Sequence, residues 1–135
     1  MERSRKTSVV KSQDRADILK AYEGYLEAFS ESDVEAIDTY IHYPLAYIGA
    51  DAVTLLDKFP INPAELRELK GWDRSEALEI DVVATGESKA HLILRNARRL
   101  RADGSLIEEA TGFYAYTRTS AGWKMFAISD IVFPA

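Results

Sequence analysis

Residues 89–133 read KAHLILRNARRLRADGSLIEEATGFYAYTRTSAGWKMFAISDIVF and carry most of the information about architecture. Three strand-like runs follow one another, separated by Ala102-Asp103-Gly104-Ser105 and by Ser120-Ala121-Gly122. An Asp-Gly pair between alternating runs is a strong hairpin signal, because glycine accepts the positive φ that the strand twist requires. The pattern predicts a long antiparallel meander with strands at 89–101, 106–118 and 123–133.

Upstream of this meander, a helix is predicted over residues 14–30. Ile18, Tyr22, Tyr25 and Phe29 recur at spacings of four, three and four residues. This spacing places their side chains in one apolar stripe along a helix. We therefore expect the stripe to face the protein core.

Further punctuation predicts two more helices and three more strands. Ser32 and Glu35 form a capping box for a second helix, which must end before Pro44. A third helix begins after the capping residue Asn62 and ends at Gly71. The additional strands are predicted at 45–49, 52–56 and 78–85. Two helices, two strands, a helix and four antiparallel strands make an α+β domain, with the helices on one face of the sheet.

Size and composition fit one domain at residues 14–135, preceded by a disordered basic tail at residues 1–13. The chain has 135 residues, a net charge of −5 and no cysteine. It contains no apolar run of about 18 residues, so no membrane-spanning helix is expected. We predict a cytoplasmic protein, since a reducing compartment is compatible with the lack of cysteine.

One basic cluster interrupts the acidic composition: Arg95, Arg98, Arg99 and Arg101. In a regular strand, residues 95, 99 and 101 share a face, and Glu108 and Glu109 on the next strand are available as partners. We expect a solvated outer face, and the alternative is a patch that binds an anionic ligand. The negative net charge argues against nucleic acid as a partner.

Candidate site residues are mostly aromatic. Tyr25 lies on the buried stripe and could offer its hydroxyl to a carbonyl or phenolate, or could bond a backbone carbonyl in the core. Tyr114 and Tyr116 share a strand face with two small residues, Ala110 and Gly112, which leaves a gap that is either pocket volume or room for the helix.

The ionisable candidates are fewer. His42 has an ordinary pKa near ~6.5, which suits a general base, or it complements the dipole at the end of the second helix. His91, at the start of a strand, is expected at the surface. The two histidines form no metal motif, and no nucleotide-binding motif occurs, so we predict neither a metal nor a cofactor.

Three stretches of the chain together resemble the nuclear transport factor two-like superfamily, and within it the SnoaL-like proteins and ketosteroid isomerases. They are YLEAFSESDVEAI at 25–37, Tyr43-Pro44, and GFYAYTRTSAGWK at 112–124. The resemblance covers residues 14–133. It implies a cone-shaped, cystatin-like fold, in which a bent and mostly antiparallel sheet wraps the helices around an apolar pocket. It also implies a homodimer that pairs through the convex sheet face.

The resemblance assigns roles to a few positions. The isomerase tyrosine that bonds the substrate oxygen corresponds to Tyr25, and its carboxylic acid partner falls at or near Tyr114. The proton-shuttling aspartate corresponds to Tyr43, which is a poor base, so His42 beside it is the remaining candidate. The resemblance also implies that Met125, Ala127, Ser129 and Ile131 face inward, which would turn Asp130 outward, whereas a register slip of one residue would turn it inward. The expected ligand-binding residues are Tyr22, Tyr43, Tyr47, Trp72, Tyr116, Met125, Ala127 and Ser129.

Two functional hypotheses follow. The first is a protein that binds an apolar small molecule in an aromatic pocket and acts as a cofactor-free isomerase, dehydratase or cyclase on a carbonyl compound, with Tyr25, His42 and Tyr114 as its catalytic residues. The second is a non-catalytic ligand-binding or dimeric interaction module of the same fold. A titratable base that faces the cavity would distinguish the first hypothesis from the second.

Overall fold

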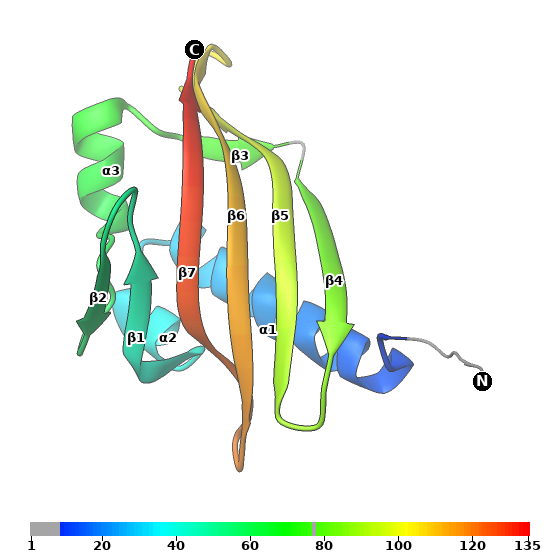
Figure 1. Cartoon of the computed structure of the whole chain (residues 1–135). Coiled ribbons are helices and arrows are strands. Elements are labelled where there is room, and N and C mark those ends of the chain that lie inside the picture. Colours follow the sequence, from blue (N-terminus) through cyan, green and yellow to red (C-terminus); the bar gives the residue numbers. More distant parts are fainter. Residues whose placement is uncertain (1–8, 77) are drawn as a thin grey trace.

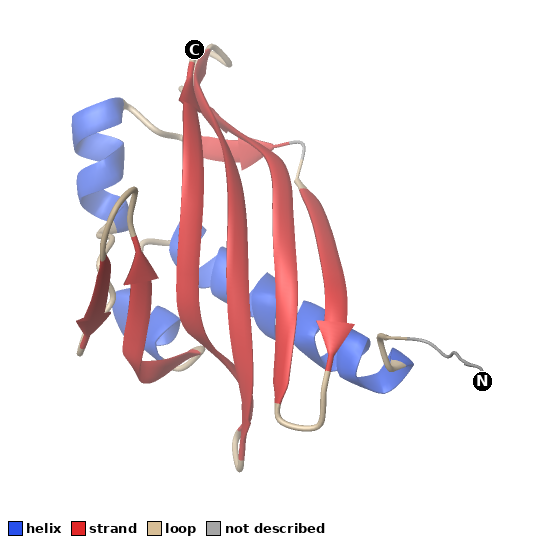
Figure 2. Cartoon of the chain, in the orientation of Figure 1, coloured by secondary structure: helices blue, strands red, loops and turns tan. Residues whose placement is uncertain are grey.

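The computed structural model describes residues 9–76 and 78–135 as an α+β domain with its helices gathered on one side of a sheet (Figures 1 and 2). The helices are α1 (Ser12–Ser30), α2 (Val34–Asp38) and α3 (Pro63–Lys70). The strands are β1 (Ile41–Ile48), β2 (Val53–Leu56), β3 (Arg74–Glu76), β4 (Glu79–Thr85), β5 (Lys89–Leu100), β6 (Leu106–Thr119) and β7 (Gly122–Pro134).

The sheet has seven strands in the described chain and is built around the predicted meander. Its order is β2-β1-β7-β6-β5-β3, and β4 also pairs with β5. The turns that join β5, β6 and β7 contain Gly104 and Gly122, whose φ angles are 88° and 104°. Both lie in the left-handed region that the turn chemistry predicts.

Two features of the sheet were not predicted. The short strand β3 pairs with the end of β5, and β1, besides its antiparallel pairing with β2, runs parallel to β7. A parallel pair joins segments that are distant in the chain, and alternation of apolar residues does not reveal such a partner.

Helix α1 crosses one face of the sheet behind the long strands β4 to β7 (Figure 1), and we call this the inner face. The predicted stripe is buried there: Ile18 and Tyr22 are 0% exposed, and Tyr25 is 5% exposed. The stripe packs against apolar side chains of the strands, among them Leu92, Met125 and Ile128. Burial of large apolar and aromatic side chains on both layers is the main force that holds α1 to the sheet.

The predicted cap of α3 is observed, whereas the predicted cap of α2 is not. The Asn62 side chain accepts the Ala64 N–H at 3.0 Å, and Gly71 ends α3 with a φ of 71°, as predicted. Helix α2, however, is capped by Asp33, whose carboxylate accepts the Ala36 N–H at 3.1 Å. The predicted cap Ser32 has a φ of 57° and belongs to the turn before the helix.

Part of the predicted tail is attached to the sheet. The Val9 carbonyl accepts the Thr85 N–H at 2.9 Å, and the Lys11 N–H donates to the Thr85 hydroxyl at 2.9 Å, just before α1 begins. The rest of that prediction, residues 1–8, lies outside the described residues. Within the described chain, no helix is long and apolar enough to cross a membrane.

Candidate functional site

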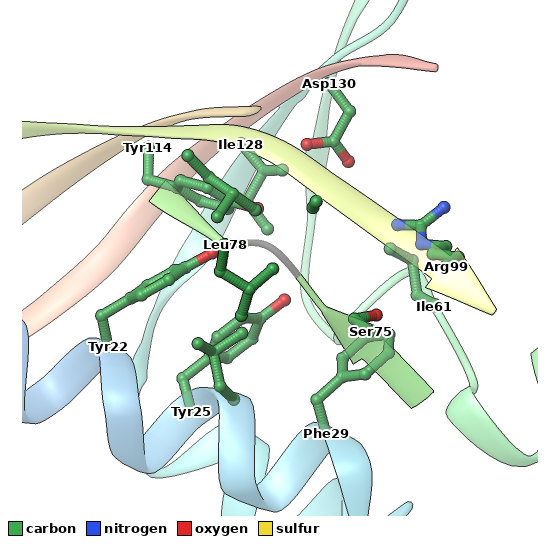
Figure 3. A pocket seen from close by; sticks show the side chains of 13 residues that line it. Tyr22, Tyr25, Phe29, Ile61, Ser75, Leu78, Arg99, Tyr114, Ile128 and Asp130 are labelled. Carbon is green, nitrogen blue, oxygen red and sulfur yellow. The ribbon is translucent and has the colours of Figure 1, made fainter. Parts of the chain in front are cut away.

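A cavity of about 60 Å³ lies between α1 and the inner face of the sheet (Figure 3). A volume of this kind holds a few water molecules or the compact polar head of a ligand. Most of the wall is apolar or aromatic, and two ionisable side chains of opposite sign face it. The lining residues are Tyr22, Tyr25, Leu26, Phe29, Ile61, Ser75, Leu78, Leu94, Ala97, Arg99, Tyr114, Ile128 and Asp130.

Three tyrosines lie together on the cavity wall. The rings of Tyr22 and Tyr25 are 5.6 Å apart, and those of Tyr22 and Tyr114 are 5.2 Å apart. Burial raises the pKa of all three phenols well above the ordinary value. They are therefore protonated near neutral pH and act as hydrogen-bond donors.

The Tyr22 hydroxyl is buried beside the Tyr114 phenol, which lowers the pKa of Tyr22 against the effect of burial, but it makes no well-formed hydrogen bond among the described residues. A buried hydroxyl without a partner costs about 1–3 kcal/mol of desolvation. Such a group is available to a polar ligand that enters the cavity.

Asp130 faces the cavity, and the predicted outward orientation is wrong. Strands β6 and β7 pair with a register shift, since Ala115 is opposite Ala127 whereas Tyr116 is opposite Met125. The extra residue, Phe126, forms a bulge, and a bulge reverses the alternation of side chains beyond it. Ile128 and Asp130 therefore continue the inner face that Met125 begins.

The Asp130 carboxylate has no hydrogen bond or ion pair among the described residues. Burial raises its pKa above the ordinary value, and the positive charge of Arg99 opposes this rise only in part. Desolvation disfavours the charged form of a carboxylate, which makes the ionised group a stronger base.

Gly112 makes room for the carboxylate. It is the cross-strand partner of Asp130, and a Cβ at this position would lie 2.8 Å from Asp130 Oδ1 and 2.9 Å from the Tyr114 hydroxyl oxygen. The gap predicted on this strand exists, but the Tyr114 ring and the Asp130 carboxylate fill it. The missing side chain therefore brings the acid and the phenol together.

Arg99 also lines the cavity, which corrects its expected place on a solvated outer face. Strand β5 carries an irregularity between Leu94 and Ala97, where Asn96 adopts a φ of 56°. The shift puts Leu94, Ala97 and Arg99 on the inner face, and leaves Arg95 exposed. A period of two counted from Arg95 past Asn96 therefore assigns Arg99 to the wrong face of the sheet.

The expected cross-strand partner of Arg99 is confirmed. One guanidinium nitrogen, Nη1, donates to Glu108 Oε2, and Lys70 Nζ donates to Glu108 Oε1 at 2.7 Å. Burial alone would raise the pKa of Glu108, but the bonds from Lys70 and Arg99 outweigh burial and hold it below the ordinary value. Glu108 thus stays ionised and fixes the position of one guanidinium nitrogen of Arg99.

The other predicted site residues lie away from this cavity. His42 is exposed and contacts Phe126 at a ring distance of 6.5 Å, so it is not placed to act as a base in the cavity. The Tyr43 hydroxyl donates to Asp38 at 2.5 Å. Trp72 packs edge-on against Phe29 from outside the cavity, at a ring distance of 5.3 Å. None of the following lines the cavity: Tyr47, Tyr116, Met125, Ala127 and Ser129.

Sequence reasoning therefore missed the two charged residues that face the cavity. The strand pattern places Arg99 on the wrong face, and it predicts the observed face of Asp130 only after a register slip of one residue. The glycine at 112 was the available signal, because a glycine within an aromatic strand marks a position where another group approaches closely. In the described chain, no group of three His, Cys, Asp or Glu side chains could hold a metal ion.

The sequence matches a known family. The sequence model of the family described as NTF2-like protein (DUF6841) matches residues 14–130. The chain belongs to this NTF2-like family. The predicted resemblance to nuclear transport factor two-like proteins is confirmed. No curated protein matches the sequence.

Solved structures agree on the fold of this NTF2-like protein. A ketosteroid isomerase-like protein from Erwinia carotovora atroseptica is similar with a TM-score of 0.63 at 18% identity, over 93% of this chain and 100% of that one. A domain with a cystatin-like fold from Nostoc punctiforme reaches a TM-score of 0.67 at 16% identity, over 90% and 78%. A provisionally named dehydratase of the NTF2-like family from Streptomyces avermitilis reaches 0.63 at 16% identity, over 90% and 96%. The predicted cystatin-like α+β fold is confirmed.

Proposed function

We propose that this protein is a cofactor-free acid/base enzyme that isomerises, dehydrates or cyclises a small carbonyl compound, with Asp130 as its general base. The observation that carries the proposal is a carboxylate that has no hydrogen-bond partner in the part of the chain that the structure describes and that faces a largely apolar cavity beside three phenols. The printed names of two structural neighbours, ketosteroid isomerase-like and dehydratase, belong to the same class of chemistry.

The proposed reaction begins with proton removal from a carbon next to the carbonyl group. Ionised Asp130 takes the proton, and the electron pair of the broken C–H bond moves to the carbonyl oxygen to form an enolate. Tyr25 and Tyr114 donate hydrogen bonds to that oxygen as its charge develops. Where the substrate carries a C=C bond next to the deprotonated carbon, the enolate is conjugated with it, and protonated Asp130 returns the proton to the far carbon of that bond. The C=C bond shifts by one position, which completes an isomerisation without a co-reactant.

Asp130 takes the role that the sequence had assigned to His42. His42 is exposed outside the cavity, whereas Asp130 lies in it and has a raised pKa. A base whose pKa lies near the working pH is the most effective proton acceptor, and burial moves the pKa of Asp130 toward that range. The orientation of Asp130 therefore favours the enzyme hypothesis over a non-catalytic module, since a titratable group facing the cavity was the criterion between them.

Hydrogen–deuterium exchange tests this proposal without knowledge of the natural substrate. A panel of small ketones and keto acids is incubated with the protein in deuterium oxide, and exchange at the carbon next to the carbonyl is followed by NMR. We expect catalysed exchange for some member of the panel, and loss of that exchange in Asp130→Asn. The matched control is Asp51→Asn, which changes an exposed aspartate in the turn between β1 and β2. Catalysed exchange that survives in Asp130→Asn would refute the assignment of the base.

We also propose that two copies of the protein pair through the sheet face opposite α1. Ile131 and Phe133 alternate with Asp130 on β7, so they turn away from the cavity, and they are 61% and 55% exposed. Large exposed apolar side chains in one place favour an interface. Light scattering after size-exclusion chromatography should give the dimer mass, and Ile131→Asp should give the monomer mass. The control is Leu69→Asp on α3, which is 82% exposed. A wild-type protein of monomer mass would refute this proposal.

A further inference from the structure

We infer that the natural ligand of the cavity carries a carboxylate group, which Arg99 binds. The substrate class is then a compact carbonyl acid with an apolar, unsaturated body rather than a neutral ketone. This inference rests on the proposed function only for the choice of the cavity as the site.

The first argument is the balance of charge around Arg99. Lys70 and Arg99 share the single carboxylate of Glu108, so this group of three side chains has one positive charge in excess. The Arg99 side chain is 18% exposed. A partly desolvated guanidinium is costly unless an anion accompanies it. Asp130 brings a charge of opposite sign to the cavity wall but makes no ion pair with Arg99 among the described residues, so an anion in the cavity would be a direct partner for the guanidinium.

The second argument is that Arg99 has donors to spare. Only Nη1 has a partner among the described residues, and that partner is Glu108 on the neighbouring strand. Glu108 anchors one corner of the guanidinium and leaves its other N–H groups without protein acceptors. Guanidinium groups bind carboxylates through two parallel N–H bonds, so a carboxylate matches the free donors better than a single carbonyl oxygen does.

The third argument is the space between Arg99 and Asp130. Both line the cavity, yet they form no ion pair with each other in the described chain. In Figure 3 the Asp130 carboxylate and the Arg99 guanidinium lie to the right, whereas Tyr22 and Tyr114 approach from the left and Tyr25 from below. The positive charge of Arg99 nevertheless lowers the pKa of Tyr25, Tyr114 and Asp130 against the effect of burial. An anionic group bound to Arg99 would therefore lie close to all of the reactive side chains.

A carboxylate at this point has a chemical consequence for the proposed reaction. A second negative charge beside Asp130 favours the protonated form of Asp130, and so makes the ionised group a stronger base toward a C–H bond. The aromatic side chains of Tyr25, Tyr114 and Phe29 line the cavity and give that part of its wall an apolar character. These two features together point to an aromatic or otherwise unsaturated carbonyl acid.

The test compares two probes of nearly equal shape, 4-hydroxybenzoate and its neutral amide 4-hydroxybenzamide, by titration calorimetry. We expect wild-type protein to bind the benzoate about tenfold more tightly than the amide, as a charge-assisted hydrogen bond implies. This preference should vanish in Arg99→Gln and persist in Arg98→Gln, which changes the exposed arginine next to it on β5. Equal binding of the two probes by wild-type protein, or a preference that survives in Arg99→Gln, would overturn the inference.

Two further variants keep the experiment decisive. If Arg99→Gln does not fold because Glu108 loses a partner, Arg99→Lys is the substitute, since it keeps a cation at this position. A lysine lacks the paired N–H donors of arginine, so this variant should bind the benzoate several-fold more weakly than the wild-type protein does. Benzoate affinity that is unchanged in Arg99→Lys would overturn the inference. Asp130→Asn should bind the benzoate at least as tightly as wild-type protein, since it removes a repelling charge, while it loses hydrogen–deuterium exchange. A preference for benzoate over the amide without any catalysed hydrogen–deuterium exchange would refute only the enzyme proposal. Catalysed exchange without that preference would refute only the carboxylate inference.

Discussion

The substitution Gly112→Ala tests the central geometry of the site with a single added methyl group. An alanine Cβ would lie 2.8 Å from Asp130 Oδ1 and 2.9 Å from both Cε2 and the hydroxyl oxygen of Tyr114, whereas ordinary contacts are 3.4–4 Å. The carboxylate must therefore retreat from 2.8 Å to about 3.4 Å. The Tyr114 ring cannot move as easily, because it packs against Tyr22 at a ring distance of 5.2 Å.

Two free-energy terms set the expected stability of Gly112→Ala. Overpacking a filled interior costs about 1–3 kcal/mol. Replacing glycine within a strand by alanine recovers about 0.5–1 kcal/mol of backbone entropy. We therefore expect a net loss of about 1 kcal/mol in the free energy of unfolding, measured by chemical denaturation. Catalysed hydrogen–deuterium exchange should fall more steeply, by at least about tenfold, because displacement of a catalytic group by a fraction of an ångström disrupts its alignment.

Gly49→Ala is the matched control for this experiment. A Cβ at Gly49 would meet only the Ala52 carbonyl oxygen, at an ordinary 3.4 Å. This variant should keep both the stability and the exchange activity of the wild-type protein. A Gly112→Ala protein with full exchange activity would refute the reasoning, because Asp130 and Tyr114 would then not need their observed positions.

Three further predictions concern stability and its dependence on pH. Tyr22→Phe removes a buried hydroxyl that has no well-formed hydrogen bond among the described residues, so the free energy of unfolding should stay the same or rise by up to about 1 kcal/mol. A loss above that size would mean that the hydroxyl is bonded in solution. Glu108→Gln leaves Lys70 and Arg99 without their shared carboxylate and should cost about 2 kcal/mol at neutral pH, less than for a fully buried pair because Lys70 is partly exposed. The pKa of Glu108 is lower in the folded protein than in the unfolded chain, so its contribution to stability is present above the unfolded pKa and is lost as pH falls through the folded pKa. The unfolding free energies of the wild type and the variant, measured by urea titration, should therefore converge in acid. Burial raises the pKa of Asp130, so ionisation of Asp130 destabilises the fold as pH rises; Asp130→Asn should be the more stable protein at neutral pH, with the difference vanishing below about pH 4, and a less stable variant at neutral pH would contradict the raised pKa.

Local signals in the sequence were sufficient for the elements and for half of the cavity. The helical spacing of Tyr22, Tyr25 and Phe29 placed all three on the buried stripe of α1, and all three line the cavity. The Asp-Gly turn and the capping residue Asn62 also act within a few residues of themselves, and both appear as predicted. Such signals are reliable because their energetics depend on neighbours in the chain.

The charged half of the cavity depends on contacts that the chain makes at long range. A strand pattern with a period of two predicts which face a side chain takes only while the pairing register is continuous. The bulge at Phe126 and the irregularity at Asn96 each break that continuity, and each turns the charged residue beyond it toward α1. No short run of letters encodes these shifts, since a bulge is defined by the partner strand as well as by its own.

The sequence by itself determined an α+β chain whose C-terminal meander packs on an aromatic helix, because periodicity and turn chemistry are properties of neighbouring residues. Only the tertiary structure decided that Asp130 and Arg99 meet three tyrosines inside the domain. The physical reason is that strand register follows from how whole strands pair and bend around α1, and a shift of one residue exchanges the inside of a sheet for its outside.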